Sequence, residues 1–452
     1  MEMAQLSIGG RVATPGDPDW DESRRGMNLA ADLNPAAVAF VEDADDVSKV
    51  IGFAREQGLK VTGQGTGHGS AALPALDGAI LIKTERMRGI EVDPDARTAR
   101  AEAGVLGSDL AGAAGAHGLC FLPGSSPTVG LTGFTLGGGL GWLGRKHGFA
   151  CNRVRAIEVV TADGVPRQVS SDADADLHWA LRGGGGGYAI VTALHLDLLP
   201  ILEVYAGALI FPAEVGAPAI RAYRDWAAEV PEEVTSSLRY LRPPPLPTVP
   251  EPIRDRPLIV ALAAYIGSEA EGEELVAPLR EIGEPIMDTF GQVPAAGLGR
   301  VAMDPEDPVP GMGHHALIRS LPDEAIDALV GVAGPEAGSP LLLAELRQAG
   351  GALGRPADDA GALGSLDAAF VMVGIGVPMD PKMVPAIAEG LDRLVETIKP
   401  WAADGGFFNF AERPCDVDAL LPAETCSRLA EVKRSWDPDD VIIANHSVSL
   451  TG

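Results

Sequence analysis

Hydrophobic and polar residues alternate with a helical period between Asp43 and Gly58. The segment begins with acidic residues and ends at a glycine, as amphipathic helices commonly do. Its apolar positions share one face of the expected helix: Val47, Val50, Ile51 and Ala54. The pattern predicts a helix that packs one side against a core and leads into a short apolar strand at 59–62.

Apolar runs farther along the chain predict strands. AILIK at 79–83 is typical of a buried strand, and the alternating residues at 97–105 are typical of a half-exposed one. A helix of small residues follows and should end at Gly118. The pair Asp163-Gly164 predicts a hairpin turn between two further strands.

The character of the sequence changes near residue 205. Glycine clusters become rarer, and a proline-rich connection at 242–257 predicts an exposed loop. Residues 205–404 therefore form a separate α+β domain in this interpretation. The tail predicts a helix and then a strand-like segment, VIIANHSV, which must pack on structure already built. The expected fold class is α+β.

Composition narrows the function classes. A chain of 452 residues with 46% apolar content can form two domains. It has no apolar run of about 18 residues and no secretory leader at its start, so we expect a cytoplasmic protein without a membrane partner. The net charge of −28 disfavours nucleic acid as a partner. Four cysteines without metal-type spacing suggest buried thiols and no metal site.

Three glycine clusters lie beside expected strands, at 63–70, 123–148 and 182–187. The first does not complete a dinucleotide fingerprint, because its spacing is wrong and Pro74 and Gly78 prevent the helix that should follow. The second lacks the GK[ST] of a phosphate-binding P-loop. Loops of this kind leave backbone N–H groups free to surround an extended, phosphate-bearing ligand.

His68 stands between Gly67 and Gly69 in the first cluster. By residue type alone it could be a loop histidine that hydrogen-bonds to backbone. Its unshielded position also suits an imidazole that acts as a nucleophile or ligand at a cofactor. Metal ligation is the weaker alternative, because no second ligand lies at metal spacing in the loop.

The motifs together resemble a known family. VTGQGTGHGS, PGSSPTVGLTGFTLGGGLG, DADLHWALRGGGGGYAIVT and the tail from FFNF to ANHSV follow one another in the order found in FAD-linked oxidases of the vanillyl-alcohol oxidase type. The sequence is most similar to the berberine bridge enzyme-like branch and to 6-hydroxynicotine-type oxidases. The resemblance implies a two-part PCMH-type FAD-binding domain, residues 1–204 and 405–452, and a substrate-binding domain, 205–404, with an antiparallel sheet flanked by helices.

The resemblance also implies the cofactor and its contacts. In this family the histidine at the position of His68 bonds covalently to the 8α-methyl group of the flavin. The residues that would contact FAD are Gly63, Gln64, Gly65, Thr66, Gly67, His68, Gly69, Ser70, Ser126, Thr128, Val129, Gly130, Gly133, Gly138, Gly139, Gly141, Asn152, Val191, Asn409 and Asn445.

Two departures from the family pattern affect the expected chemistry. Ser126 occupies the position of a cysteine that forms a second flavin bond in many relatives, so we expect a single bond, through His68. The family's catalytic tyrosine is also missing, because its YxNY element is FFNF here, which includes Asn409. Either another group is the base, or the substrate is an amine or a phenol of low pKa that needs none.

Candidate catalytic groups remain. Asn409 could bond the flavin or a substrate oxygen, or could cap local structure. Glu345 is the preferred base, with a raised pKa if it lies on an apolar strand facing the cavity. The other candidates are His314, His315, Asp367 and Tyr240, each of which could be purely structural. His446, beside Asn445, is expected at the surface.

The expected function is that of an FAD-dependent oxidase. Its substrate would be a small aromatic, amine, alcohol or phenolic metabolite that loses hydride, and O2 would accept the electrons and form H2O2. The alternatives are an FAD dehydrogenase with a different acceptor, a catalytically inert flavin-binding protein and a flavin-assisted cyclase. We expect a monomer or a homodimer.

Overall fold

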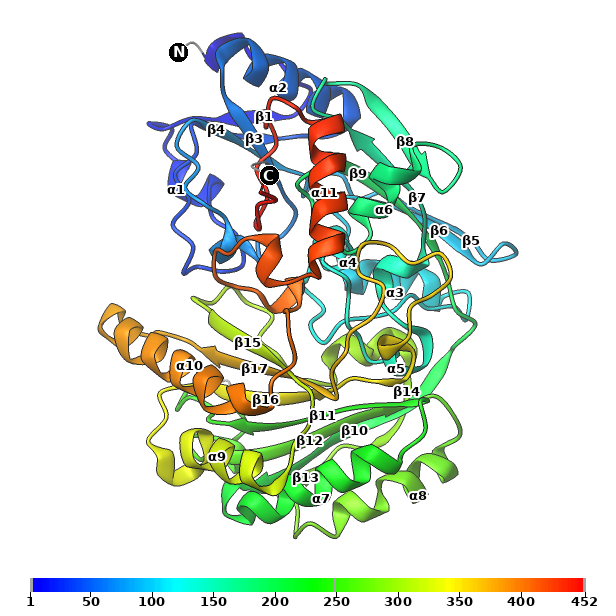
Figure 1. Cartoon of the computed structure of the whole chain (residues 1–452), viewed down its shortest axis with the longest axis vertical. Coiled ribbons are helices and arrows are strands. Elements are labelled where there is room, and N and C mark those ends of the chain that lie inside the picture. The colour runs from blue at the N-terminus through cyan, green and yellow to red at the C-terminus, as the bar shows by residue number, and fades with distance from the viewer. Residues whose placement is uncertain (1–2, 248, 450–452) are drawn as a thin grey trace.

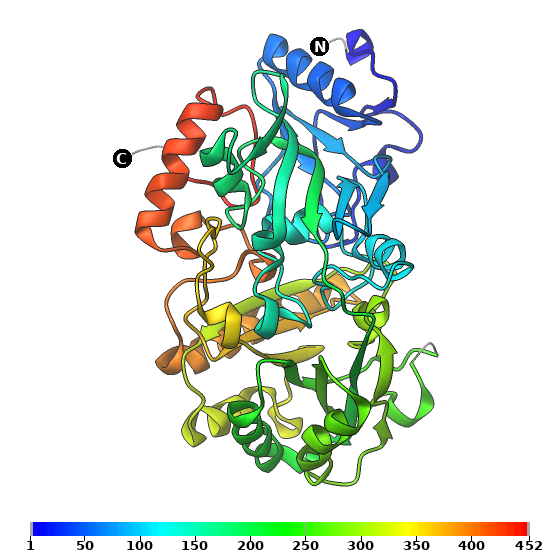
Figure 2. The same cartoon turned by 90° about the vertical axis from the view of Figure 1, so that its right-hand side faces the viewer.

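A computed structural model describes residues 3–247 and 249–449. The chain folds into two lobes, one above the other in Figure 1. The first lobe holds the N-terminal part of the chain together with the C-terminal helix, and the second holds the middle part. Figure 2 shows the same division from the side, with the large sheet of the second lobe facing the first. The expectation of an α+β fold is confirmed.

The first lobe contains two sheets. A four-stranded sheet has the order β1-β2-β4-β3, from Arg11–Ala13, Ala37–Phe40, Ala79–Lys83 and Lys60–Gln64. A five-stranded antiparallel sheet has the order β5-β6-β9-β7-β8, from Ile90–Asp93, Thr98–Glu102, Ile190–Asp197, Val154–Val160 and Pro166–Ser170. The helices of this lobe before the tail are α1 (Trp20–Ser23), α2 (Ala44–Gln57), α3 (Gly107–Gly115), α4 (Leu131–Leu136), α5 (Gly144–His147) and α6 (Ala175–Leu181).

The sequence patterns explain several of these elements. Helix α2 begins after Asp43, whose side chain accepts a hydrogen bond from the N–H of Asp46, and ends at Gly58, whose φ of 66° suits glycine. The hairpin at Asp163-Gly164 joins β7 to β8. Helix α3 ends at Gly115, three residues before the expected Gly118.

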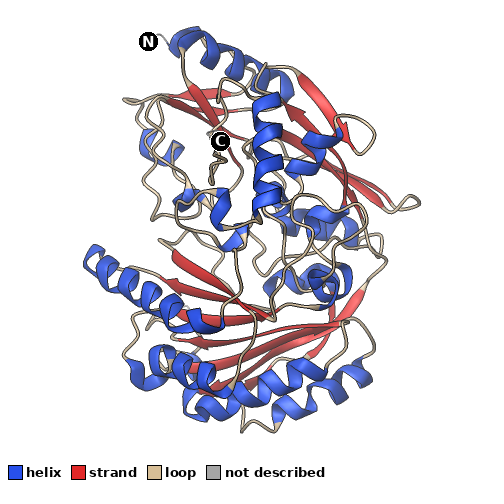
Figure 3. Ribbon diagram, viewed as in Figure 1, coloured by secondary structure: helices blue, strands red, loops and turns tan. Residues whose placement is uncertain are grey.

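The second lobe is built on an eight-stranded sheet. Its main path runs β13-β10-β12-β11-β16-β17-β15, with β14 paired to β10, and all of its pairs are antiparallel. In chain order β10 to β17 are Glu203–Pro212, Val234–Leu241, Leu258–Tyr265, Met287–Asp288, Gly291–Pro294, Met312–Ile318, Leu343–Gln348 and Phe370–Gly376. Four helices cover its outer face in Figure 3: α7 (Gly216–Glu229), α8 (Glu269–Arg280), α9 (Asp323–Ala333) and α10 (Val384–Ile398).

The tail returns to the first lobe through helix α11, Ala423–Trp436. The strand-like segment expected after it makes one parallel bridge, between Val61 and Ile442, and is otherwise irregular. Its path is fixed by Lys433, whose Nζ donates to the carbonyls of Gly187 and Ile442 at 2.9 and 2.8 Å. The tail therefore lies between the last glycine loop and β3.

Two faces of the large sheet have different partners. Strand periodicity places alternate residues on opposite faces. One face packs with α7 to α10 in an apolar cluster, and the other joins the apolar core of the first lobe. We call this second face the cavity face. No helix among residues 3–247 and 249–449 is long and apolar enough to span a bilayer.

Candidate active site

Two loops of the first lobe offer unpaired backbone donors. The N–H groups of residues 65–69, after β3, donate to no described protein atom, and the same holds for those of Ser125, Ser126, Thr128 and Val129. The loops are joined where the N–H of Gly130 donates to Thr66 Oγ1 at 3.1 Å. Convergent N–H groups of this kind suit a pyrophosphate, so this observation fits a dinucleotide cofactor such as FAD.

His68 lies where the two loops meet. Its Nε2 is 3.2 Å from Thr128 Oγ1, and Thr128 Oγ1 is 3.2 Å from Ser126 Oγ. Partial burial holds the pKa of His68 below its ordinary value, although the contact with Thr128 acts in the opposite direction. The imidazole is therefore neutral near pH 7.

Asn445 and Ser70 complete this cluster. Asn445 donates from Nδ2 to the carbonyl of Gly69 at 2.7 Å, and Gln64 donates from Nε2 to Ser70 Oγ at 2.9 Å. Gln64 Oε1 is buried without a partner among the described residues. A cavity of about 250 Å³ borders Ser70 and the segment that follows it. The structure thus brings together the predicted residues from Gly63 to Ser70, from Ser126 to Gly130, and Asn445.

Other predicted cofactor residues are engaged by protein. A methyl group on Gly139 or Gly141 would clash with Ala150 or with the carbonyl of Pro123, so both glycines permit close chain packing. Gly138, with φ of 111°, is similarly enclosed by Leu363 and Phe407. Gly133 by contrast faces open space. Close packing, rather than a ligand, accounts for much of the second glycine cluster.

The amides of Asn409 and Asn152 also bind protein. Asn409 accepts from the N–H of Gly139 at 2.8 Å and donates to the carbonyl of Phe134 at 3.1 Å. Asn152 accepts from the N–H of Gly361 at 2.9 Å and donates to the carbonyl of Leu363 at 3.2 Å. The capping alternative for Asn409 thus matches the geometry. Val191 is buried in β9, opposite Val159 of β7.

The cavity face of the large sheet carries a row of side chains across four strands. Arg239 of β11 lies opposite Glu345 of β16, which is opposite Val373 of β17, itself opposite His315 of β15. His315 accepts from the N–H of Phe407 at Nε2, at 2.9 Å. Burial lowers its pKa to about 4, so it is neutral near pH 7.

The remaining candidate bases lie elsewhere. Tyr240 is on the helix-covered face, where burial raises its pKa to about 12. His314 is on that face too, because it neighbours His315 along the strand. Asp367 is exposed in the loop before β17. None of these three candidates lies on the cavity face, so the geometry favours the structural alternative for each.

Glu345 faces the cavity, but its predicted pKa shift is wrong in direction. Burial alone would raise the pKa of its carboxyl group. Arg347 and Arg239 more than offset that effect and hold the pKa below its ordinary value. Arg347 Nε donates to Glu345 Oε2 at 2.9 Å. Glu345 is therefore an ionised, paired carboxylate, and much of its role is to orient Arg347.

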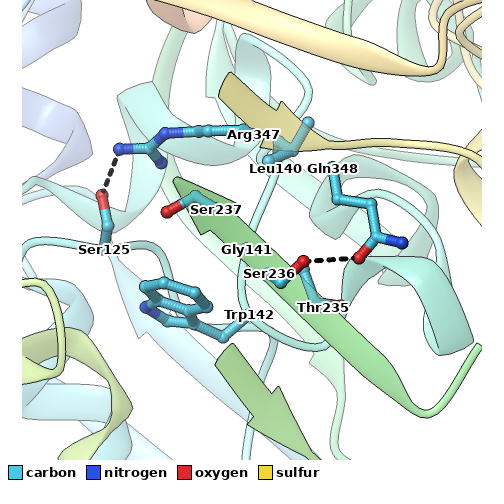
Figure 4. A pocket seen from close by; sticks show the side chains of 9 residues that line it. All are labelled: Ser125, Leu140, Gly141, Trp142, Thr235, Ser236, Ser237, Arg347 and Gln348. Atoms are coloured by element: carbon cyan, nitrogen blue, oxygen red, sulfur yellow. Dashed lines mark hydrogen bonds between the residues drawn. The ribbon is translucent and has the colours of Figure 1, made fainter. Parts of the chain in front are cut away.

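Arg347 links the sheet to the first lobe. Its guanidinium donates to Ser125 Oγ at 3.1 Å and lies 4.9 Å from the ring centre of Phe410. Figure 4 shows this contact at one end of a small cavity between the lobes. The cavity is lined by Ser125, Leu140, Gly141, Trp142, Thr235, Ser236, Ser237, Arg347 and Gln348. Sequence reasoning missed Arg347, although its spacing of two residues from Glu345 places it on the same strand face.

Glu412 is a second residue that sequence reasoning missed. Its carboxylate lies over Gly313 of β15, where a side chain larger than hydrogen would displace it. No cation among the described residues pairs with it, and burial raises its pKa to about 7. Only its position two residues after Phe410 of the FFNF element could have drawn attention to it.

Two expectations for the tail are corrected. His446 is buried, at 5% exposure, with its ring edge against Phe408 and its Nδ1 3.3 Å from Cys415 Sγ. It is therefore not a surface residue. Cys415 is only partly buried, whereas Cys120, Cys151 and Cys426 are the buried thiols that the sequence predicts. Within the described residues, no group of three His, Cys, Asp or Glu side chains could hold a metal.

Comparison with known proteins identifies the first lobe. Residues 35–170 match the family model described as FAD binding domain. An uncharacterized FAD-linked oxidoreductase, YgaK of Bacillus subtilis, is 29% identical over 63% of this chain and 61% of its own length. The match to FAD-linked oxidoreductase pytB of Aspergillus terreus spans only 29% of that protein, so the chain aligns with less than two thirds of both.

One relative is similar along its whole length. The (R)-6-hydroxynicotine oxidase of Paenarthrobacter nicotinovorans is 25% identical over 99% of this chain and 98% of its own. The crystal structure of 6-hydroxy-D-nicotine oxidase from Arthrobacter nicotinovorans superposes over 100% of both chains with a TM-score of 0.83 at 24% identity. Berberine bridge enzyme from Eschscholzia californica gives a TM-score of 0.81 at 19% identity, covering 97% and 96%. Residues 35–170 therefore form an FAD binding domain, and the chain as a whole is similar to (R)-6-hydroxynicotine oxidase and shares the fold of berberine bridge enzyme.

Proposed function

We propose that the protein is an oxidase that carries FAD bonded covalently to His68 alone. The observation that carries this proposal is the neutral imidazole of His68 at the junction of two loops with unpaired N–H groups. The neutral ring supplies a lone pair as the nucleophile for the bond. Ser126, near His68 through Thr128, has a hydroxyl in place of a thiol and forms no second bond.

The predicted residues of both loops would hold the cofactor. The N–H groups after β3 and those of residues 125–129 would bind its pyrophosphate, and Asn445 would fix the His68 loop through Gly69. FAD would supply two-electron acceptance from a substrate C–H bond and delivery of those electrons to O2, which gives H2O2.

The substrate class follows from the bases on the cavity face. Glu345 is ionised but stabilised by two arginines, so it is a weak proton acceptor. Asn409 is held by Phe134 and Gly139, so we assign it to positioning. The site therefore favours a small aromatic or cyclic metabolite that needs no strong base, such as an amine with its lone pair or an ionised phenol.

Two measurements test the proposal. Acid precipitation should give a yellow pellet, and the tryptic peptide that contains His68 should be heavier by one FAD. Purified protein supplied with amines, alcohols and phenols should consume O2 and release an equal amount of H2O2. Flavin reduction without O2 consumption would instead indicate a dehydrogenase, and a flavin that no compound reduces would indicate an inert flavin-binding protein.

A further inference from the structure

The carboxyl group of Glu412 lies on the cavity face of the large sheet. A Cβ atom on Gly313 of β15 would be 2.5 Å from Glu412 Oε2, so the carboxyl group rests directly over that glycine. Gly313 and His315 are two residues apart on one strand and therefore face the same side. Figure 1 shows β15 where the second lobe meets the first. Glu412 thus borders the space between the lobes, two strands away from Glu345.

The start of β15 adjoins the glycine loop that follows β3. Asn28 and Gly311 exchange two hydrogen bonds, from Asn28 Nδ2 to the carbonyl of Gly311 at 3.0 Å and from the N–H of Gly311 to Asn28 Oδ1 at 3.1 Å. The N–H of Asn28 also donates to the carbonyl of Gly67 at 3.3 Å. Gly311 precedes Gly313 by two residues. Glu412 is therefore placed beside the loop in which we expect the flavin to be attached.

No protein group in the described part of the chain pairs with this carboxyl group. Burial is the one cause of its raised pKa, and no hydrogen bond or ion pair contributes to the shift. The neighbouring cation, Arg413, pairs with Asp392 of α10 instead. Glu412 still keeps part of its surface accessible, so a small molecule can reach it. An enclosed but reachable carboxyl group without a partner is costly to keep, and such groups gather at functional sites.

Two other titratable groups of the cavity face cannot exchange a proton near pH 7. Glu345 stays ionised because two arginines hold its pKa below the ordinary value. His315 has a pKa of about 4, and the lone pair of its Nε2 already accepts from the N–H of Phe407. The pKa of Glu412, raised to about 7, suits proton exchange at neutral pH, and its carboxylate is a moderate base. This property matches a substrate that needs no strong base.

We propose that Glu412 is a catalytic residue that contacts the substrate and accepts its proton. This inference rests on the proposed function, because it assumes a flavin at His68. A substrate C–H bond would give its hydride, with both electrons, to FAD, and the neighbouring N–H or O–H bond would give its proton to the Glu412 carboxylate. The C–N or C–O bond of the substrate then becomes a double bond. The proton would leave Glu412 for solvent before the next turnover, when O2 takes the electrons from FAD.

The ionisation of Glu412 can be measured without a substrate. Infrared difference spectra of the holoprotein between pH 6 and 8 detect carboxyl groups that lose a proton in that range, and the flavin absorbance detects a charge that appears beside the ring. We expect a carboxyl band and a flavin absorbance change that both titrate near pH 7 in the parent and are lost in Glu412→Gln. Asp416→Asn, which changes an exposed carboxylate on the same segment, is the matched control and should keep both signals.

The rate of flavin reduction tests the catalytic role. Holoprotein is mixed in the absence of O2 with the amines, alcohols and phenols of the panel, and the loss of flavin absorbance is followed between pH 5 and 9. In the parent the rate should rise with pH and become constant above about pH 7, as the carboxylate forms. Glu412→Gln should slow reduction about 100-fold or more and remove this rise, because proton transfer by a positioned side chain contributes that much. Glu412→Asp should restore part of the rate.

Gly313→Ala tests the position of the carboxyl group. The added methyl group would displace the carboxyl group of Glu412 without removing it. We expect reduction to slow at least about tenfold, because a small misplacement of a catalytic group is costly, while a carboxyl band that titrates remains. Gly331→Ala in α9 is the matched control, since a methyl group there meets no atom within 4 Å, and it should reduce at the parent rate.

The outcomes separate the two proposals. Protein that binds no flavin, or whose flavin no compound in the panel reduces, overturns the proposed function. Reduction at the parent rate in Glu412→Gln, or a slower rate with an unchanged dependence on pH, overturns the role of Glu412 and leaves the proposed function standing. A parent protein without a carboxyl band that titrates near pH 7 also overturns that role, as does a flavin absorbance change that persists in Glu412→Gln, because another group then titrates beside the cofactor.

Discussion

His68 places a neutral imidazole where the two loops meet, and this arrangement predicts how the flavin is attached. Replacing His68 with alanine removes the nucleophile, so acid precipitation of His68→Ala should leave all of the flavin in the supernatant. Ser126→Ala is the control and should keep a yellow pellet, because within the described part of the chain the Ser126 hydroxyl hydrogen-bonds to Thr128 and not to His68. A colourless pellet from Ser126→Ala would contradict the assignment of a single bond to His68.

Thr128 gives a finer prediction at the same site. Its hydroxyl lies 3.2 Å from Nε2 of the His68 ring, and its backbone also hydrogen-bonds to the imidazole. Thr128→Val keeps the shape and removes the bond, so either ring nitrogen could then react. We expect slower flavin attachment in Thr128→Val, measured as covalent flavin per protein after apoprotein is incubated with FAD. Attachment at the unchanged rate would show that Thr128 does not orient the ring.

Glu412 predicts a pH dependence of stability. Burial raises its pKa from 4.5 to about 7, so the folded protein favours the protonated carboxyl group. That stabilising contribution is complete below pH 4.5 and is lost as the pH rises through about 7. Above pH 7 the free energy of unfolding of Glu412→Gln should therefore exceed that of the parent protein by up to about 3 kcal/mol. Near pH 4.5 the two free energies of unfolding should be equal.

Chemical denaturation at several pH values measures this difference. Glu389→Gln, on the exposed side of α10, is the control and should follow the parent at every pH. If Glu412→Gln and the parent lose stability in parallel between pH 5 and 9, then Glu412 is not held protonated by its surroundings.

At the scale of elements, helix α11 fixes the tail against the last glycine loop. Lys433 Nζ donates to Asp437 Oδ2 at 2.6 Å and to two carbonyls, and it is 5% exposed. Asp437 in turn accepts from the N–H groups of Val441 and Ile442, both at 2.8 Å. These bonds set the path of the segment that carries Asn445.

Removing the charge of Lys433 should release this segment. Lys433→Met leaves Asp437 buried and unpaired, which costs about 3–5 kcal/mol for a broken buried pair. We expect a lower free energy of unfolding and faster proteolysis after residue 437. Lys399→Met, whose amine pairs with exposed Glu396, is the matched control and should cost less than about 1 kcal/mol. An equal loss of unfolding free energy in the two variants would show that the bonds of Lys433 do not fix the tail.

Sequence patterns predicted many of the helices and turns, because interactions between neighbouring residues determine them. The period and caps of α2, and the Asp163-Gly164 hairpin, depend on neighbouring residues only. Strand alternation likewise places the neighbours His314 and His315 on opposite faces of the sheet. The irregular path of VIIANHSV could not be inferred this way, because Lys433 and Asp437 satisfy backbone groups that a strand would otherwise pair.

Some features of the candidate site could be predicted from the sequence, and others could not. The His68 loop was visible in sequence, because glycines around one imidazole are a local feature. The charge state of Glu345 was not, since it depends on Arg239 from another strand. Gly138, Gly139 and Gly141 look alike in sequence whether they approach a ligand or the chain itself, and only tertiary packing distinguishes the two.

At the scale of the whole molecule, the cavity depends on the relative position of the two lobes, because residues of both lobes line it. Arg145 of helix α5 crosses that boundary and is 8% exposed. Its guanidinium donates to the carbonyls of Ala349, Pro231 and Val234, at 3.1, 3.1 and 2.6 Å. These acceptors belong to the ends of β16 and β11, the two strands that supply the polar residues of the cavity.

Arg145→Met should therefore loosen the lobes and the cavity together. Unsatisfied buried carbonyls and lost charge-assisted bonds predict a loss of about 2–4 kcal/mol in the free energy of unfolding. Because Trp142 precedes helix α5, ligand affinity at the cavity should also fall, while the flavin stays bonded to His68. The adjacent Lys146 crosses the same boundary, where its amine pairs with exposed Glu233 at 2.6 Å. Lys146→Met is therefore the control. It should lower the free energy of unfolding by at most about 1 kcal/mol and leave ligand affinity at the cavity unchanged. Denaturation curves and ligand titrations on both variants measure these effects, and an Arg145→Met protein of full stability and affinity would mean that apolar packing alone keeps the lobes in register.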